Sequence, residues 1–88
     1  MKFSSDHPDA EEPLDRWYRL ARKARWQSLA EVRRDYPHAD LVGQCTVFNI
    51  HGNHYRLIVK IDYWGQAIYI KHVLSHREYD REKWRNDC

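Results

Sequence analysis

Basic and titratable side chains stand close together in the second half of the sequence, in a pattern that suits a phosphate. Arg56 and Lys60 are four residues apart in a strand-like segment, which places them on one face of a strand. A second group follows the next such segment: His76, Arg77, Tyr79 and Asp80. An open sheet with cations on its uncovered face and titratable groups at its rim would form an anion site.

These residue types could cleave RNA without a metal. The reaction needs a base to deprotonate the 2′-hydroxyl, cations around the phosphate and an acid for the departing 5′-oxygen. His76 is our candidate general acid, Arg56 the bidentate phosphate ligand and Lys60 a nearby point charge. The base stays open between Asp80, His54 and Tyr79, and Tyr79 has the alternative of stacking on a splayed base. Contacts to RNA are expected from Lys60, Lys71, Arg77 and His54.

The same residues have ordinary structural explanations. A strand arginine such as Arg56 is commonly solvated or salt-bridged, and Lys60 and Lys71 are typical surface residues. His76 stands in the first turn of a predicted helix, and Tyr79 would suit a core. From the residues alone, the inference stops at a basic α+β domain that binds an anion.

Two histidine pairs come near the spacing of zinc ligands. His51 and His54 flank a predicted hairpin turn, whereas His72 and His76 leave the end of a strand. Neither pair comes with a pair of cysteines, as many structural zinc sites do. We therefore predict no metal and no cofactor.

The first half of the chain must supply the helices that support such a site. Apolar residues recurring every three or four positions predict a helix over about residues 10–25 and a shorter one that ends before Pro37. Capping boxes are expected at both starts, Asp9 with Glu12 and Ser28 with Glu31. The range 16–34 holds seven basic residues and one acid, so the helices carry a basic face.

From Cys45 onward the apolar period changes to two. The pattern predicts three consecutive antiparallel strands at about 45–51, 54–63 and 67–74, with turns at Gly52-Asn53 and Trp64-Gly65-Gln66. In the central strand, one set of alternate residues should pack on the helices: Tyr55, Leu57, Val59 and Ile61. In the third strand, another alternate set should share a face: Ile68, Ile70, His72 and Leu74. A third capping box, Ser75 with Glu78, predicts a polar helix through about Trp84.

The length of 88 residues fits one domain, residues 1–88, and the 14% aromatic content can supply its core. The tryptophans are expected to be packing residues: Trp17, Trp26, Trp64 and Trp84. No segment has the length and apolarity of a signal peptide or membrane span. Two cysteines, Cys45 and Cys88, are too few for a disulfide scaffold, so we expect a protein of the reducing cytoplasm with no membrane contact.

Five stretches, in family order, resemble the HigB toxins of bacterial toxin–antitoxin modules, within the RelE-like ribonuclease superfamily. They are His7–Leu14, Ala24–Trp26, Asp35–Asp40, Val47–Leu57 and Ser75–Asp80. The resemblance extends over nearly the whole chain, and the hairpin motif FNIHGNHYR followed by HREYD is specific as a pair. The resemblance implies a RelE-like α+β fold with two N-terminal helices packed on an antiparallel three- to four-stranded sheet, and a short C-terminal helix.

The resemblance also implies a function, that of a ribosome-dependent mRNA interferase. Such a toxin cuts the message in the decoding site, is neutralised by a helix-turn-helix antitoxin of the HigA type, and reaches operator DNA only through that antitoxin. Arg56 matches the strand arginine that contacts the scissile phosphate, and His76 matches the position of a catalytic histidine or basic residue. Lys60, Arg77, Tyr79 and Asp80 transfer less directly. The basic helices would meet ribosomal RNA or the antitoxin.

The chain departs from the family at its start. Family members usually begin with a β-strand before the motif at His7, where this chain has only Met1–Asp6. We therefore expect the family's first strand to be missing or shortened: either this sequence starts inside the natural reading frame, or the sheet has three strands and an unpaired edge. Two alternatives stay open: a non-nucleolytic toxin, as in the gyrase-poisoning branch, and an inactive module that binds RNA or the antitoxin. His76 and Tyr79 argue against the first.

Overall fold

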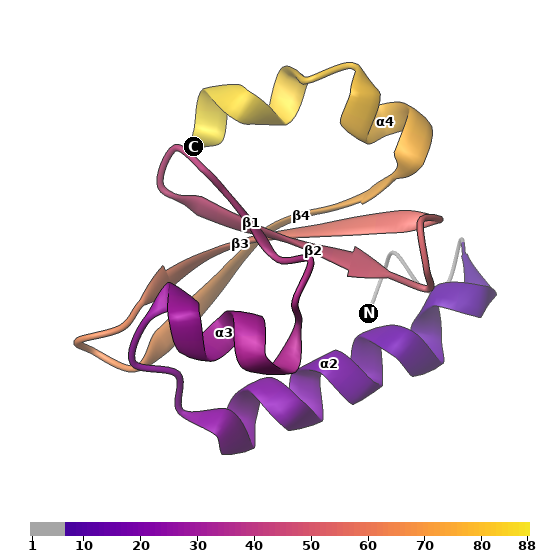
Figure 1. Ribbon diagram of the computed structural model, residues 1–88. Helices are drawn as coiled ribbons and strands as arrows, with labels where there is room; N and C mark the ends of the chain where they lie inside the picture. Colours follow the sequence, from indigo (N-terminus) through magenta and orange to yellow (C-terminus); the bar gives the residue numbers. More distant parts are fainter. Residues whose placement is uncertain (1–6) are drawn as a thin grey trace.

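A computed structural model describes residues 7–88 as an α+β domain with a four-stranded antiparallel sheet in its centre. The strands are β1 (Asp40–Val42), β2 (Cys45–Ile50), β3 (Tyr55–Asp62) and β4 (Ala67–Ser75), in the spatial order β1-β2-β3-β4. Helices α2 (Glu11–Ala24) and α3 (Leu29–Asp35) lie on one side of the sheet (Figure 1). The C-terminal segment, with α4 (His76–Asp80) and the 3-10 helix η2 (Lys83–Asp87), lies on the other.

Helix α2 packs its apolar stripe on the sheet, as its spacing predicts. Leu14, Trp17 and Ala21 are buried, and the helix ends where Arg25 takes a left-handed conformation (φ 47°). The predicted capping box at its start is wrong. A short 3-10 helix, η1 (Pro8–Ala10), precedes α2, and the Asp9 carboxylate accepts a hydrogen bond from the Tyr55 hydroxyl instead.

The start of α3 forms only half of the capping box that the sequence predicts. The Ser28 hydroxyl accepts a hydrogen bond from the Glu31 backbone N–H at 3.4 Å, but the Glu31 carboxylate accepts from the Gln27 N–H, one residue earlier than in a capping box. Helix α3 ends at Asp35, just before Pro37. Both predicted helices are therefore confirmed.

The three predicted strands are confirmed, and β1 is an additional one that the sequence pattern did not reveal. It has only three residues, too few to display a period of two. The turn into β2 contains Gly43, whose φ is 59° and whose absent Cβ would meet the Cys88 carbonyl oxygen at 2.5 Å. Glycine is needed there because other residues rarely adopt this positive φ and because a side chain would clash with Cys88. The place of the family's first strand, residues 1–6, lies outside the described residues.

Packing on the two faces of β3 follows the predicted alternation. Tyr55, Leu57 and Val59 join the core under α2 and α3, together with Phe48, Trp17 and Trp26. Ile58 points the other way, into a second cluster with Cys45, Val47 and Trp84. The sheet face expected to be uncovered is thus partly covered by the C-terminal segment, because the apolar residues on this face require burial.

Strand β4 does not alternate as predicted. Val59 pairs with Ile70 and Ile58 with His72, so Lys71 is an extra residue in β4, a bulge. Ile68 consequently packs with the helix-side core, whereas Leu74 packs with the opposite cluster. The expected single face for both is wrong, because one inserted residue exchanges the two faces beyond it.

The C-terminal segment differs from the single helix predicted to reach about Trp84. Helix α4 ends at Asp80, Glu82 is left-handed (φ 59°), and η2 then carries Trp84, which is 2% exposed, onto the sheet. A disulfide between Cys45 and Cys88 closes this segment onto β2. The two cysteines, too few for a disulfide scaffold, nevertheless pair.

Three of the four tryptophans are buried, as expected, but Trp64 is 97% exposed at the β3–β4 turn. None of the helices formed by residues 7–88 is long and apolar enough to cross a membrane.

Candidate functional site

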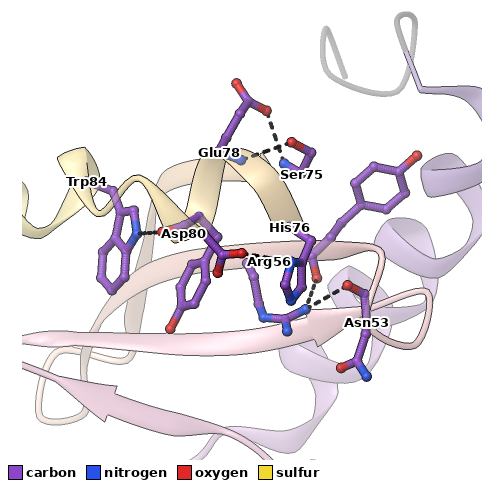
Figure 2. Close-up of polar contacts among 9 residues, drawn as sticks. Asn53, Arg56, Ser75, His76, Glu78, Asp80 and Trp84 are labelled. Carbon is purple, nitrogen blue, oxygen red and sulfur yellow. Dashed lines mark hydrogen bonds and ion pairs between the residues drawn. The ribbon is translucent and has the colours of Figure 1, made fainter.

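Arg56 occupies the sheet face opposite α2 and α3, beside the β2–β3 turn. Its Nη1 donates to two backbone carbonyls, that of Asn53 at 3.1 Å and that of Tyr55 at 3.2 Å (Figure 2). Within the described part of the chain, its Nε and Nη2 have no hydrogen bond. The fork is therefore held at one nitrogen and keeps three N–H donors for an anion, the arrangement that binds two phosphate oxygens.

Tyr79 lies against Arg56 and is supported from the C-terminal segment. The guanidinium carbon of Arg56 is 5.3 Å from the centre of the Tyr79 ring, within cation–π range. The Trp84 ring stacks on Tyr79 at 4.9 Å, and its N–H donates to the Tyr79 carbonyl at 2.9 Å. The ring thus has two partners within the protein, which disfavours stacking on a base and leaves its hydroxyl for polar contacts.

His76 and Asp80 form a pair one helical turn apart on α4. The His76 Nδ1 is 3.1 Å from an Asp80 carboxylate oxygen, and both side chains are more than half exposed. The His76 backbone N–H donates to the His54 carbonyl at 3.0 Å, which joins α4 to the β2–β3 turn. Because Asp80 occupies Nδ1, the Nε2 of His76 is the nitrogen available to a substrate.

The start of α4 is fixed by the capping box predicted from Ser75 and Glu78. The Ser75 hydroxyl accepts from the Glu78 N–H at 3.2 Å, and the Glu78 carboxylate accepts from the Ser75 N–H at 3.0 Å. This backbone hydrogen bond lowers the pKa of Glu78 below its ordinary value of 4.5. The box sets the direction in which α4 leaves β4, and so the position of His76.

The remaining predicted residues lie around this cluster at different distances. Lys60 lies on the same strand face as Arg56 but four residues along, about 13 Å away. It lines a shallow pocket with Tyr69 and Lys71 near the far end of the sheet. Arg77 is exposed on α4, and His54 is exposed in the β2–β3 turn.

The structure therefore brings together four of the predicted residues and separates the two lysines from them. Arg56, Tyr79, His76 and Asp80 form what we call the α4 cluster. Sequence reasoning missed the Asn53 carbonyl that holds Arg56 and the Trp84 ring that supports Tyr79. The contact to the Asn53 carbonyl left no signal in the sequence. The position of Ile58, an apolar residue on the strand face that carries Arg56 and Lys60, was a signal that another segment covers this face.

Potential metal ligands meet at the β2–β3 turn. Asp9, His51 and His54 each offer a ligand atom, and these atoms lie within 4.8 Å of one another. The α4 cluster itself offers one imidazole and one carboxylate, His76 and Asp80, which is a small donor set for a metal.

Comparison with known proteins adds to this geometry. The sequence profile of the HigB toxin family, described as the RelE-like toxic component of a toxin–antitoxin system, matches residues 10–82. The chain is also 26% identical over 78 residues to a protein of Escherichia coli O6:H1 named mRNA interferase HigB, an alignment that covers 85% of this chain and 76% of that protein. The chain therefore belongs to the HigB toxin family of RelE-like toxins from toxin–antitoxin systems.

Proposed function

We propose that this toxin is an endoribonuclease that cuts mRNA during translation on the ribosome, without a metal in its reaction. The family supplies the toxic component of a toxin–antitoxin system, and the name of the similar Escherichia coli protein describes an enzyme that acts on mRNA. The α4 cluster supplies the matching chemistry. Two observations within residues 7–88 carry the proposal together: Arg56 keeps three N–H donors and lies against Tyr79 of α4, and His76 on the same helix keeps its Nε2 without a partner.

The proposed reaction is attack of a 2′-oxygen on the adjacent phosphorus, with loss of the 5′-oxygen of the next nucleotide. Arg56 binds the phosphate oxygens as their negative charge grows in the transition state. His76 gives the proton from Nε2 to the departing 5′-oxygen, and Asp80 keeps the imidazole oriented through Nδ1. A 2′,3′-cyclic phosphate and a free 5′-hydroxyl result.

Two groups compete for the role of the base that removes the 2′-hydroxyl proton. Asp80 is already paired with His76, which leaves the Tyr79 hydroxyl and the His54 imidazole as the competing groups. The pH dependence of cleavage by Tyr79→Phe and His54→Ala variants separates them, since loss of the base removes the corresponding limb of the pH–rate profile.

Partners follow from the same proposal. The substrate is mRNA in the ribosomal decoding site, contacted further by Lys60, Lys71, Arg77 and His54, with the basic face of α2 and α3 turned to ribosomal RNA or the antitoxin. The antitoxin is a helix-turn-helix protein of the HigA type, which alone contacts operator DNA. The toxin acts in the cytoplasm, where translated mRNA is found.

A purified system tests ribosome dependence and metal independence together. The chain is treated with chelator, desalted, and added to a reconstituted translation reaction in which Mg²⁺ serves the ribosome, with the same mRNA incubated without ribosomes as control. We expect cuts in the translated message alone, with 5′-hydroxyl ends. Cuts in free RNA would contradict ribosome dependence, and cuts that appear only after zinc is restored would contradict metal independence. Translation without cuts would favour the non-nucleolytic or inactive alternatives.

A further inference from the structure

A cluster distinct from the α4 cluster brings together three side chains from two segments of the chain. Asp9 lies in η1, before α2, and His51 and His54 lie in the β2–β3 turn. The Asp9 Oδ2 is 3.7 Å from the His51 Nε2, and the two imidazole rings have centres 4.7 Å apart. All three are exposed, so an ion can reach them from solvent.

The carboxylate of this cluster is held in place from the core. The hydroxyl of Tyr55, whose side chain is 7% exposed, donates to Asp9 Oδ1 at 2.5 Å. That bond leaves Oδ2 directed at His51. A ligand carboxylate oriented by a buried hydrogen-bond donor is a common feature of protein metal sites, where such outer partners raise affinity.

The backbone of the turn holds the two histidines on one side. His51 takes a left-handed conformation (φ 53°), followed by Gly52 (φ 63°), and the His54 N–H donates to the His51 carbonyl at 3.2 Å. The turn thereby folds the two rings toward each other. A non-glycine residue in this conformation is uncommon, so the position of His51 is set by the turn and not by free rotation of an open loop.

Two imidazoles and one carboxylate form a donor set suited to a divalent transition metal. Zinc binds imidazole nitrogen and carboxylate oxygen at about 2.0–2.2 Å, so neighbouring ligand atoms in a tetrahedral site are about 3.4 Å apart. The ligand atoms here lie within 4.8 Å, so modest rotations of the exposed side chains complete the geometry. Magnesium and calcium prefer oxygen ligands and would bind poorly.

We propose that Asp9, His51 and His54 form a binding site for a zinc-class divalent ion, with a fourth position open to water. The ion ties η1 to the β2–β3 turn. Two carbonyls of that turn support the α4 cluster. The Asn53 carbonyl accepts from Arg56, and the His54 carbonyl accepts from the His76 N–H at the start of α4. An ion that rigidifies the turn therefore rigidifies the support of the α4 cluster. Zinc binding is measured without RNA or ribosomes, so it is tested separately from the proposed nuclease activity, in which His54 is one of the two candidate bases.

Calorimetric titration of the untagged full chain with ZnCl₂, in a buffer that does not bind metal, tests the site. We expect saturable binding of one ion per chain. Asp9→Asn, His51→Asn and His54→Ala should each weaken it by more than tenfold, and Tyr55→Phe by about tenfold or more as an outer-partner loss. Asparagine is chosen at position 51 because it tolerates the left-handed backbone.

The matched control is His38→Ala, which removes another exposed histidine, from the turn after α3. It should bind zinc as the parent does. Circular dichroism checks the fold of every variant. We expect the fold to be retained in the ligand variants because the three ligands are surface side chains. Absence of saturable binding to the parent would overturn the proposal. So would unchanged affinity in folded Asp9→Asn and His54→Ala variants.

Discussion

Arg56 is held by backbone carbonyls, so its positive charge stays available to a substrate. The two bonds from Nη1 to Asn53 and Tyr55 hold the guanidinium without neutralising it. Lysine at this position would offer a point charge on a flexible stem, unable both to keep the two carbonyl bonds and to bind two phosphate oxygens.

We therefore predict that Arg56→Lys lowers the rate of mRNA cleavage by about 10²–10³-fold, the usual effect of removing a transition-state donor. The rate is measured by primer extension on a translated message. Lys83→Ala, which removes an exposed cation from η2, is the control and should cleave as the parent does. Cleavage at the parental rate by Arg56→Lys would show that bidentate binding is not needed.

In the proposed reaction, Asp80 acts through His76 and is a positioning residue. Its carboxylate contacts Nδ1 of His76 at 3.1 Å, and both groups are largely solvated. We predict that Asp80→Asn lowers kcat and leaves KM unchanged. The fall in kcat should be smaller than the about 10²–10⁴-fold loss expected for His76→Ala. The measurement is single-turnover cleavage against ribosome concentration. A rise in KM at constant kcat would instead assign Asp80 to RNA binding.

Among the elements, α4 depends on its first turn. The pKa of Glu78 is lowered by its bond to the Ser75 N–H, so the charged form stabilises the folded state. That contribution is present above the ordinary pKa of 4.5 and is lost as the pH falls through the lower folded value. Acidification should therefore loosen α4 by protonating this side chain.

We predict that the melting temperature of Glu78→Gln is lower than that of the parent at neutral pH and that the difference narrows on acidification below about pH 4.5. Thermal melts across this range check it, with a chelator present. Glu12→Gln, which removes an exposed acid from α2, is the control and should follow the parent. A difference that stays constant down to the acid end would rule out the cap as its cause.

Elements with a clear period or cap were predictable from the sequence, whereas most contacts between distant segments were not. The apolar stripe of α2, the three long strands and the box at Ser75 all follow from local patterns. The box at Asp9 failed because a tertiary hydrogen bond to Tyr55 competes for the same carboxylate. The bulge at Lys71 is set by pairing across strands, which composition does not encode.

At the scale of the whole molecule, the C-terminal segment differs most from the prediction. It turns an open sheet into one with a second small core, in which Ile58 and Trp84 are buried and through which Tyr79 is supported. The close grouping of Arg56 and His76 could be expected from strand order alone. The separation of Lys60 and Lys71 from them also follows from strand length, so the expectation that Lys60 lies near Arg56 is wrong.

The disulfide fixes that segment, and we predict that Cys88→Ser lowers the free energy of unfolding by roughly 2–4 kcal/mol, because the bond closes a long loop. Guanidinium unfolding under oxidising conditions measures this. Reductant should lower the parent to the stability of the variant and leave the variant unchanged. Equal stability of parent and variant would contradict the bond's role. Because the cytoplasm keeps thiols reduced, the proposed cytoplasmic activity should be assayed with the protein in its reduced state.

The most direct test of the central claim is induced expression of this chain in a bacterial host, with growth followed and the 5′ ends of messages mapped, beside His76→Ala. We predict growth arrest with new cuts within translated reading frames, both absent in the folded His76→Ala protein. Arrest without cuts would contradict the nuclease and favour a non-nucleolytic toxin. Neither arrest nor cuts from soluble, folded parent would contradict toxic activity of this chain altogether.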